Sequence, residues 1–187
     1  MAINIKTIIN EHIDTIKKLS NKDNSIEEIS ALCLKTIENG NTILLCGNGG
    51  SAADAIHIAA ELVGKFESNR ESFPAIALSS NISNITSIGN DFGFEHIFSR
   101  QIEGVGNKGD LLIAISTSGN SQNIIQAVEK ANIKKMKVII LTGKDGGKLS
   151  DMNYDLILKV DSYNTARIQE AHILIGHIIC NYIEKNI

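Results

Sequence analysis

The sequence has a single proline, Pro74, no tryptophan and only three cysteines. The scarcity of proline means that few breaks interrupt regular structure, and many glycines fall at the junctions between periodic segments. Cys33, Cys46 and Cys180 are odd in number, widely spaced and embedded in apolar surroundings. This pattern argues against a disulfide framework or a zinc knuckle, and indicates reduced core thiols in a cytoplasm.

Long apolar runs, targeting signals and an excess of basic residues are also missing. No apolar run approaches the ~20 residues of a membrane span, and the first residues lack the basic patch, apolar stretch and cleavage site of a signal peptide. The 21 acidic and 18 basic side chains give a net charge of −3. With lysines scattered singly, this balance argues against binding nucleic acid through its phosphates. We expect a soluble cytoplasmic protein without a membrane or nucleic-acid partner.

The length of 187 residues and the apolar fraction of 43% predict one globular domain, residues 1–187, with enough apolar material for a core. Its first 40 residues show two helical patterns. Isoleucines at helical spacing predict an amphipathic helix over 3–19. A second helix is expected to open at Ser25, with Glu28 as its capping-box partner, and to stop before Gly40. These two leading helices could cover a sheet edge, pair with another subunit or pack on the same domain.

From residue 41 to 187, short apolar runs alternate with helical segments. Runs that are apolar at every position predict strands buried on both faces, as in a parallel sheet covered by helices. We therefore expect a doubly wound α/β core with the flavodoxin-like strand order, whose ligands bind beyond the carboxyl ends of the strands. The predicted strands are 42–46, 75–79, 111–116, 137–142 and 155–160. The predicted helices are 51–63, 82–103, 121–133 and 164–186, with a short turn near 147–151.

A glycine-rich segment at 47–51, GNGGS, follows the first predicted strand and leads directly into a helix. Glycines let the backbone approach an anion, and the N–H groups of a new helix favour negative charge. A tight turn with nothing bound is the alternative, but the small Ala52 and Ala53 keep the opening free. The formal dinucleotide fingerprint is weak because residues 79–81 offer no acid for a ribose, and no lysine follows the glycines as in a Walker-type site.

The third predicted strand ends in a second polar loop, 116–121, with the sequence STSGNS. Its four hydroxyls and its glycine could form another anion cradle made of neutral donors. Helix capping by Ser118 or Ser121 is the alternative, and it explains one hydroxyl rather than four. Two such loops at the ends of strands of one sheet predict a site for a small phosphorylated polyol held at one end.

Two helices carry groups suited to proton transfer or metal binding. His57 and Glu61 lie four residues apart on an apolar helix and share one face, although an isolated pair of this kind is more often a surface salt bridge. Gln169 and His177 share a broad face of the last helix, where His177 alone would more often be a core residue than a ligand. Together they make a sugar-phosphate isomerase plausible, with a carboxylate moving a proton beside a carbonyl.

Five segments together resemble the phosphoheptose isomerases of the sugar isomerase (SIS) domain family, over essentially the whole chain. The resemblance implies a three-layer αβα sandwich and a homotetramer with active sites between subunits. It further implies conversion of sedoheptulose 7-phosphate to D-glycero-D-manno-heptose 7-phosphate through an enediol, as a first step towards heptose precursors of lipopolysaccharide or capsule. The segments are CGNGGSAADAIHIAAELVGKF, PAIALSSNISNITSIGNDFGFEHIFSRQIE, ISTSGNSQNII, LTGKDGG and RIQEAHILIGH.

The resemblance also implies roles for individual residues. The family's catalytic base falls on Glu61 and its acid on His177. Its zinc ligands, for one ion per subunit, fall on His57, Glu61, Gln169 and His177. Its substrate contacts fall on Asn48, Gly49, Gly50, Ser51, Glu61, Asn90, Asp91, Ser116, Thr117, Ser118, Ser121 and Gln169.

Two non-catalytic alternatives are less well matched. A relative of this fold that binds the bacterial replication initiator lacks the catalytic glutamate and terminal histidine, whereas this chain has both. A sugar-phosphate-sensing regulator would need a DNA-binding domain, for which the 40 leading residues are too few and too acidic. One departure from the family is Ala166, where some relatives carry an acidic residue. His12 and His96 are expected to be ordinary surface histidines.

Overall fold

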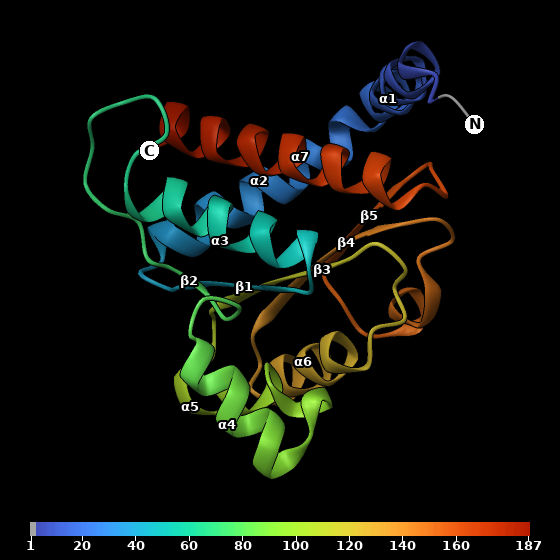
Figure 1. The fold of residues 1–187 in the computed structure, drawn as a ribbon. Helices are drawn as coiled ribbons and strands as arrows, with labels where there is room; N and C mark the ends of the chain where they lie inside the picture. Colours follow the sequence, from blue (N-terminus) through green and yellow to red (C-terminus); the bar gives the residue numbers. More distant parts are fainter. Residues whose placement is uncertain (1–2) are drawn as a thin grey trace.

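The computed structural model describes residues 3–187 and consists of a five-stranded parallel sheet between two helical layers (Figure 1). The strand order is β2-β1-β3-β4-β5, and each adjacent pair is parallel. This confirms the predicted doubly wound fold and its flavodoxin-like order. The strands are β1 (Ile43–Gly47), β2 (Ala75–Ala77), β3 (Leu111–Ser116), β4 (Lys137–Gly143) and β5 (Leu156–Val160). The helices are α1 (Ile5–Leu19), α2 (Asp23–Glu38), α3 (Gly50–Val63), α4 (Ile82–Phe92), α5 (Ser99–Val105), α6 (Gln122–Ile133) and α7 (Thr165–Asn186).

Both faces of the sheet are apolar, and helices cover both of them. Alternate residues of each inner strand point to opposite sides, so Ile113 packs into one core cluster and its neighbour Leu112 into the other. Helices α2, α3 and α7 cover the first face, and α4, α5 and α6 cover the second (Figure 1). Within the described residues, no helix is long and apolar enough to cross a membrane.

Some predicted boundaries were wrong. The helix expected over 82–103 is divided, because Gly93 adopts a φ of 95° and ends α4 before the short 3-10 turn η2 (Phe94–His96) and α5. Helix α2 begins at Asp23 rather than at Ser25, and its N-cap residue, Lys22, makes no side-chain cap, so the predicted capping box does not form. Strand β2 is also shorter than expected and ends at Ala77.

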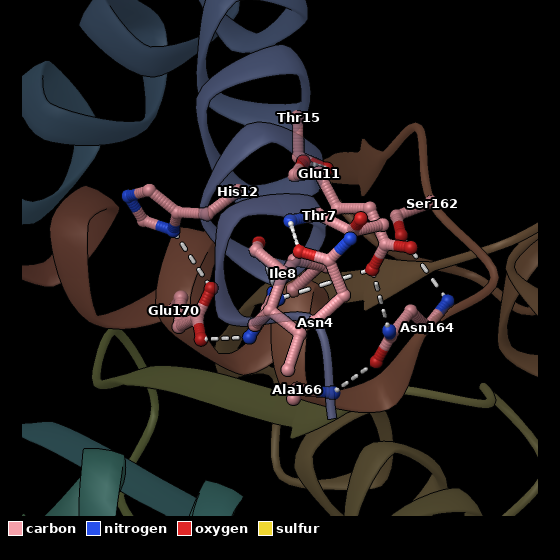
Figure 2. Close-up of polar contacts among 11 residues, drawn as sticks. Asn4, Thr7, Ile8, Glu11, His12, Thr15, Ser162, Asn164, Ala166 and Glu170 are labelled. Carbon is pink, nitrogen blue, oxygen red and sulfur yellow. Dashed lines mark hydrogen bonds and ion pairs between the residues drawn. The ribbon is translucent and has the colours of Figure 1, made fainter. Parts of the chain in front are cut away.

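Helix α1 is fixed to the start of α7 by a polar cluster (Figure 2). Arg167 donates to the carbonyl oxygen of Ile8 over 2.9 Å and also to the carboxylate of Glu170. His12 Nδ1 lies 2.7 Å from Glu170 Oε2. Burial raises the pKa of Glu170, but the hydrogen bonds from Arg167 and His12 outweigh it and lower that pKa. His12 lies at the surface as predicted, with 44% of its side chain exposed, and it also joins two helices through Glu170.

Buried His172 of α7 is expected to make the stability depend on pH. Its Nε2 lies 3.2 Å from the carbonyl oxygen of Thr142, and burial lowers its pKa to about 4, with that hydrogen bond opposing the shift. Between about pH 6.5 and 4 the unfolded chain binds a proton that the folded chain does not. The free energy of unfolding is therefore unaffected by the titration of His172 above pH 6.5 and decreases as the pH falls towards 4.

The measurement is the melting temperature of the wild type and of His172→Gln at several pH values from 7.5 to 5. The glutamine amide can still donate to Thr142 but does not titrate. We expect the wild-type melting temperature to fall more steeply with acidification than that of the variant. Parallel curves for the two proteins would contradict the buried neutral state of His172.

Candidate functional site

The glycine-rich segment 47–51 forms the turn between β1 and α3. Gly49 has a φ of 55°, a conformation that favours glycine, and helix α3 begins at Gly50 without a side-chain cap. A Cβ on Gly47 would overlap the backbone of Ser51, so the turn has no room for a side chain at this position. The uncapped first turn of α3 leaves backbone N–H groups and the positive end of the helix dipole available to an anion.

The polar loop 116–121 forms the corresponding turn between β3 and α6. Ser121 occupies the N-cap position but makes no side-chain cap, and its Oγ lies 3.3 Å from the Oγ of Ser116. The Oγ of Ser118 accepts a hydrogen bond from the backbone N–H of Asn120 over 3.2 Å. Capping of α6 therefore does not account for these hydroxyls, and two of them face each other within the loop.

The two turns meet because β1 and β3 are adjacent in the sheet. The strand order reverses at this point, which is where doubly wound sheets bind ligands. Asn48 and Asn123 exchange two amide hydrogen bonds of 2.8 Å, which join the first turn to the start of α6. A cavity of about 70 Å³ opens here, lined by Asn48, Ser51, Ile115, Ser116, Thr117, Ser121 and Gln169. The structure thus brings both predicted cradles to one small polar cavity.

Helices α3 and α7 approach each other closely at two glycines. A Cβ on Gly50 would lie 2.5 Å from Gln169 Nε2, so this side chain reaches the cavity against the first residue of α3. A Cβ on Gly176 would lie 2.5 Å from Cδ1 of Ile58. The close approach at Gly176 is therefore made by a side chain of α3, and the two helices that carry the titratable groups lie side by side.

The titratable residues His57 and Glu61 of α3 form a cluster with His177 of α7. His57 Nε2 lies 3.1 Å from Glu61 Oε1, and the rings of His57 and His177 are 5.0 Å apart and nearly perpendicular. The ring of Phe66 lies 5.6 Å from that of His177. The side chain of Glu61 is 24% exposed, so solvent and substrate can reach it. The His57–Glu61 pair is therefore more than an isolated salt bridge on a helix surface.

The four predicted zinc ligands are divided between two places in one chain. Gln169 lines the cavity between the turns, and His177 lies eight residues further along α7, a rise of about 12 Å. Among residues 3–187, no group of three or more His, Cys, Asp and Glu side chains is arranged to hold a metal ion. The donor types, imidazole, carboxylate and amide oxygen, fit zinc, while their convergence is incomplete within a single subunit.

Asn90 and Asp91 lie at the end of α4, on the opposite face of the sheet from α3 and α7 (Figure 1). Asn90 Nδ2 donates to Asp91 Oδ1 over 2.7 Å, and both residues are exposed. The single chain therefore does not bring this pair to the cavity. No periodicity or glycine pattern marks the pair in the sequence, and only the resemblance to the SIS family points to it.

Asp54 is a further candidate that was missed at the level of the sequence. It lies on α3 between the glycine-rich turn and His57, and its Oδ2 is buried with no hydrogen-bond partner in the described chain. Burial raises the pKa of Asp54 to about 6, although the charge of His57 opposes the shift. A carboxyl group that titrates near pH 6 beside other titratable groups is suited to proton transfer. The spacing of three residues to His57 is the signal that could have identified it.

Comparison with known proteins places this geometry in a family. The family model for the SIS domain matches residues 9–143. A phosphoheptose isomerase from a Nitratiruptor species is 50% identical over 187 residues, which is 100% of both chains. The structure of a phosphoheptose isomerase from Neisseria gonorrhoeae superposes with a TM-score of 0.92 at 43% identity, and one from Francisella tularensis with 0.94 at 40%. Each structure covers 97% of both chains.

Proposed function

The chain belongs to the SIS domain family, and on that premise we propose that it is an aldose–ketose isomerase that converts sedoheptulose 7-phosphate to D-glycero-D-manno-heptose 7-phosphate. The observation that carries the proposal is the cluster of Glu61, His57 and His177 on the two helices that border a cavity of neutral anion donors. The phosphoheptose isomerases similar to this chain over its full length support it. The non-catalytic alternatives are not favoured.

The proposed reaction transfers one proton between neighbouring carbons. The carboxylate of Glu61 removes a proton from C1 of the ketose, and the electron pair forms the C1–C2 double bond. The carbonyl oxygen at C2 takes a proton from His177, which gives the enediol. Glu61 then returns a proton to C2 while the O1 hydroxyl gives its proton to His177, and the aldehyde forms. Each positioned acid or base typically contributes about 10²–10⁴-fold in rate.

The phosphate at the far end of the substrate is proposed to bind in the cavity at the switch point. Hydroxyls of Ser116, Thr117 and Ser121 and the first turn of α3 would donate to its oxygens. The Nε2 group of Gln169 would contact the substrate from α7, which leaves its Oε1 for the metal proposed below. Since these donors are neutral or backbone groups, the site can hold the phosphate without a lysine. Remaining substrate contacts are proposed for Asn48, Gly49, Gly50, Ser51, Ser118, Asn90 and Asp91.

We also propose zinc as a cofactor, one ion per subunit, held by His57, Glu61, Gln169 and His177. Three of these four donors are already neighbours, through the 3.1 Å contact of His57 with Glu61 and the edge-to-face contact of the two imidazoles. When bound, zinc would polarise the substrate carbonyl as a Lewis acid. Assembly with a second subunit is a way to complete the ligand set.

Replacing His177 by glutamine is expected to lower the zinc content below one ion per subunit, because an imidazole ligand is lost. The measurement is metal analysis after dialysis against zinc-containing buffer. His96→Gln is the matched control, since His96 lies in η2 outside the cluster, and it should retain the wild-type stoichiometry. Unchanged zinc content in His177→Gln would contradict the proposed ligand set.

A homotetramer with active sites between subunits is proposed from the apolar surface of the chain. Helix α1 exposes Ile5, Ile9 and Ile13 at 69%, 52% and 40%, although their spacing predicts a packing face. A largely apolar groove of about 620 Å³ lies nearby, between the leading helices and α7. Contiguous apolar surface of this kind is typical of contacts between proteins.

The pair Asn90–Asp91 is flanked by exposed Phe92 and Phe94, which would suit a subunit contact that delivers the pair to a neighbouring cavity. Light scattering is expected to report a tetramer for the wild type and smaller species for Ile9→Lys. A monomeric wild type would overturn the assembly.

The proposed reaction belongs to the cytoplasm and supplies a heptose phosphate for a surface polysaccharide such as lipopolysaccharide or capsule. The three cysteines are free and buried, as in a reducing compartment.

The direct test of the function is proton NMR of sedoheptulose 7-phosphate with the purified protein in D₂O. Formation of the aldose phosphate with deuterium at C2 is expected, because the proposed enediol exchanges its transferred proton with solvent. Parallel samples with added zinc and with a chelator measure the contribution of the metal. Absence of conversion in all samples would overturn the proposed function.

A further inference from the structure

The guanidinium of Arg70, in the segment between α3 and β2, binds the end of α3. Its Nη2 donates to the carbonyl oxygen of Glu61 over 2.7 Å, and its Nη1 donates to those of Leu62 and Glu71 over 2.9 Å each. The last carbonyls of a helix have no partner within the helix. Arg70 therefore satisfies two of them, and one belongs to the proposed catalytic base itself.

The third nitrogen of the guanidinium, Nε, donates to Glu184 Oε1 over 2.9 Å. Glu184 lies near the end of α7, and its carboxylate also accepts the backbone N–H groups of Phe66, Glu67 and Ser68 at 2.8, 3.0 and 2.8 Å. The side chains of Arg70 and Glu184 are only 10% and 3% exposed. Burial raises the pKa of Glu184, but these hydrogen bonds lower it to about 2, so the carboxylate is charged.

Phe66 connects this buried pair to the proposed acid. Its backbone N–H is held by Glu184, and its ring lies 5.6 Å from the ring of His177 with a tilt of 32°. His177 and Glu184 are seven residues apart, two turns along the same face of α7. The ion pair therefore binds the backbone of Glu61 through Arg70, and it holds Phe66, which contacts the imidazole of His177, through Glu184.

We propose that Arg70 and Glu184 are positioning residues that set the placement of Glu61 relative to His177 and thereby the rate of proton transfer. The proposal rests on the proposed isomerase function. Arg70 fixes the end of α3, Glu184 fixes Phe66 against His177, and the ion pair joins the two halves. A displacement of ~1 Å at a reacting group can lower a rate by about 100-fold.

The chemistry of the pair favours positioning over simple stabilisation. A buried ion pair gives little net stability relative to an apolar pair of the same volume, because both charges lose their hydration. Arginine, in contrast, presents several donors in a rigid planar fork, which fixes the direction of each acceptor. Lysine keeps the charge but cannot bind Glu184 and three carbonyl oxygens in this geometry.

The test compares Arg70→Lys and Glu184→Gln with the wild type, and uses Asp155→Asn as the matched control. Like Glu184, Asp155 pairs with a basic side chain, Lys137 at 2.7 Å, and accepts a backbone N–H, that of Val138 at 2.8 Å. It lies at the amino end of β4, whereas the candidate site lies beyond the carboxyl ends of the strands. The readouts are kcat, KM, the melting temperature and the proton NMR resonance of the His177 imidazole Hε1. That resonance is assigned by its absence from the spectrum of His177→Gln.

In Arg70→Lys and Glu184→Gln we expect kcat to fall by about 10- to 100-fold with KM changed by less than about threefold, because the phosphate donors lie elsewhere. The His177 resonance should move as the ring of Phe66 shifts. Asp155→Asn should leave kcat and the resonance unchanged. Because Arg70→Lys retains the charge, it decides the matter if Glu184→Gln does not fold.

A lower melting temperature with unchanged kcat and an unchanged His177 resonance would overturn the proposal, since it describes a structural pair only. An equal loss of kcat in Asp155→Asn would overturn it as well. If the wild type does not convert sedoheptulose 7-phosphate, the isomerase function fails. The resonance of His177 then decides alone whether the pair positions the imidazole.

Discussion

Replacing Glu61 by glutamine is expected to lower the rate of isomerisation by about 10²–10⁴-fold while the fold and the substrate affinity are retained. The amide has the volume of the carboxylate but cannot accept a proton from C1. Substrate affinity should persist because the proposed phosphate donors lie on other residues, in the turns that follow β1 and β3. The loss should therefore appear in kcat with little change in KM.

The measurement is the initial rate of aldose formation and of deuterium incorporation at C2, followed by NMR. The matched control is Glu129→Gln, because Glu129 is an exposed glutamate of α6 that bonds only to Gln126 in the described chain. Circular dichroism and thermal melting of both variants test the fold. A kcat for Glu61→Gln within a factor of two of the wild-type value would refute the assignment of Glu61 as the base.

Replacing Gly119 by alanine is expected to destabilise the protein by more than about 3 kcal/mol and to disrupt phosphate binding. Gly119 has a φ of 66°, where a side chain costs about 1–3 kcal/mol. A Cβ there would also overlap the carbonyl oxygen of Gly146, in the loop that follows β4. The two loops are joined by the hydrogen bond from Leu149 N–H to the Gly119 carbonyl over 3.0 Å. Relief of the overlap therefore requires both loops to move.

Substitutions at two further glycines distinguish the cost of a positive φ from the cost of a steric overlap. Gly40 has a φ of 74° but open space around a Cβ, so Gly40→Ala should show the conformational cost alone. Gly104, in α5, has neither constraint, and Gly104→Ala should be neutral or stabilising by about 0.5–1 kcal/mol. At ~2–4 °C per kcal/mol for a chain of this size, Gly119→Ala should melt more than about 6 °C below the wild type. Equal melting of Gly119→Ala and Gly40→Ala would show that the close approach to Gly146 has no effect on stability.

The order of elements was predictable because it depends on local patterns. Strands apolar at every position are typical of a sheet covered on both faces, and β1, β3 and β4 are buried as predicted. The internal bounds of the segment 82–103 were not predictable from periodicity, since the break depends on Gly93 adopting a positive φ that glycine permits but does not require.

Both polar turns of the candidate site were also predicted, because the glycines and hydroxyls lie directly after apolar runs. Parallel strands bring their carboxyl ends to one edge, so the meeting of the turns follows from the fold class. The grouping of His57 with Glu61 follows from their spacing on one helix. That His177 joins them, and that Gln169 reaches the cavity instead, depends on the packing of α7 against α3 at Gly50 and Gly176.

The sequence by itself determined the α/β class and the two turns, because each depends on residues that are neighbours along the chain. The flavodoxin-like strand order was expected for this class and was established by the pairing of the strands in the sheet. Only the tertiary structure decided the contacts between distant side chains. His12 meets Glu170 across 158 residues, and Arg70 meets Glu184 across 114. Such contacts leave no periodic trace, because a hydrogen bond depends on where two elements pack and not on the residues beside them.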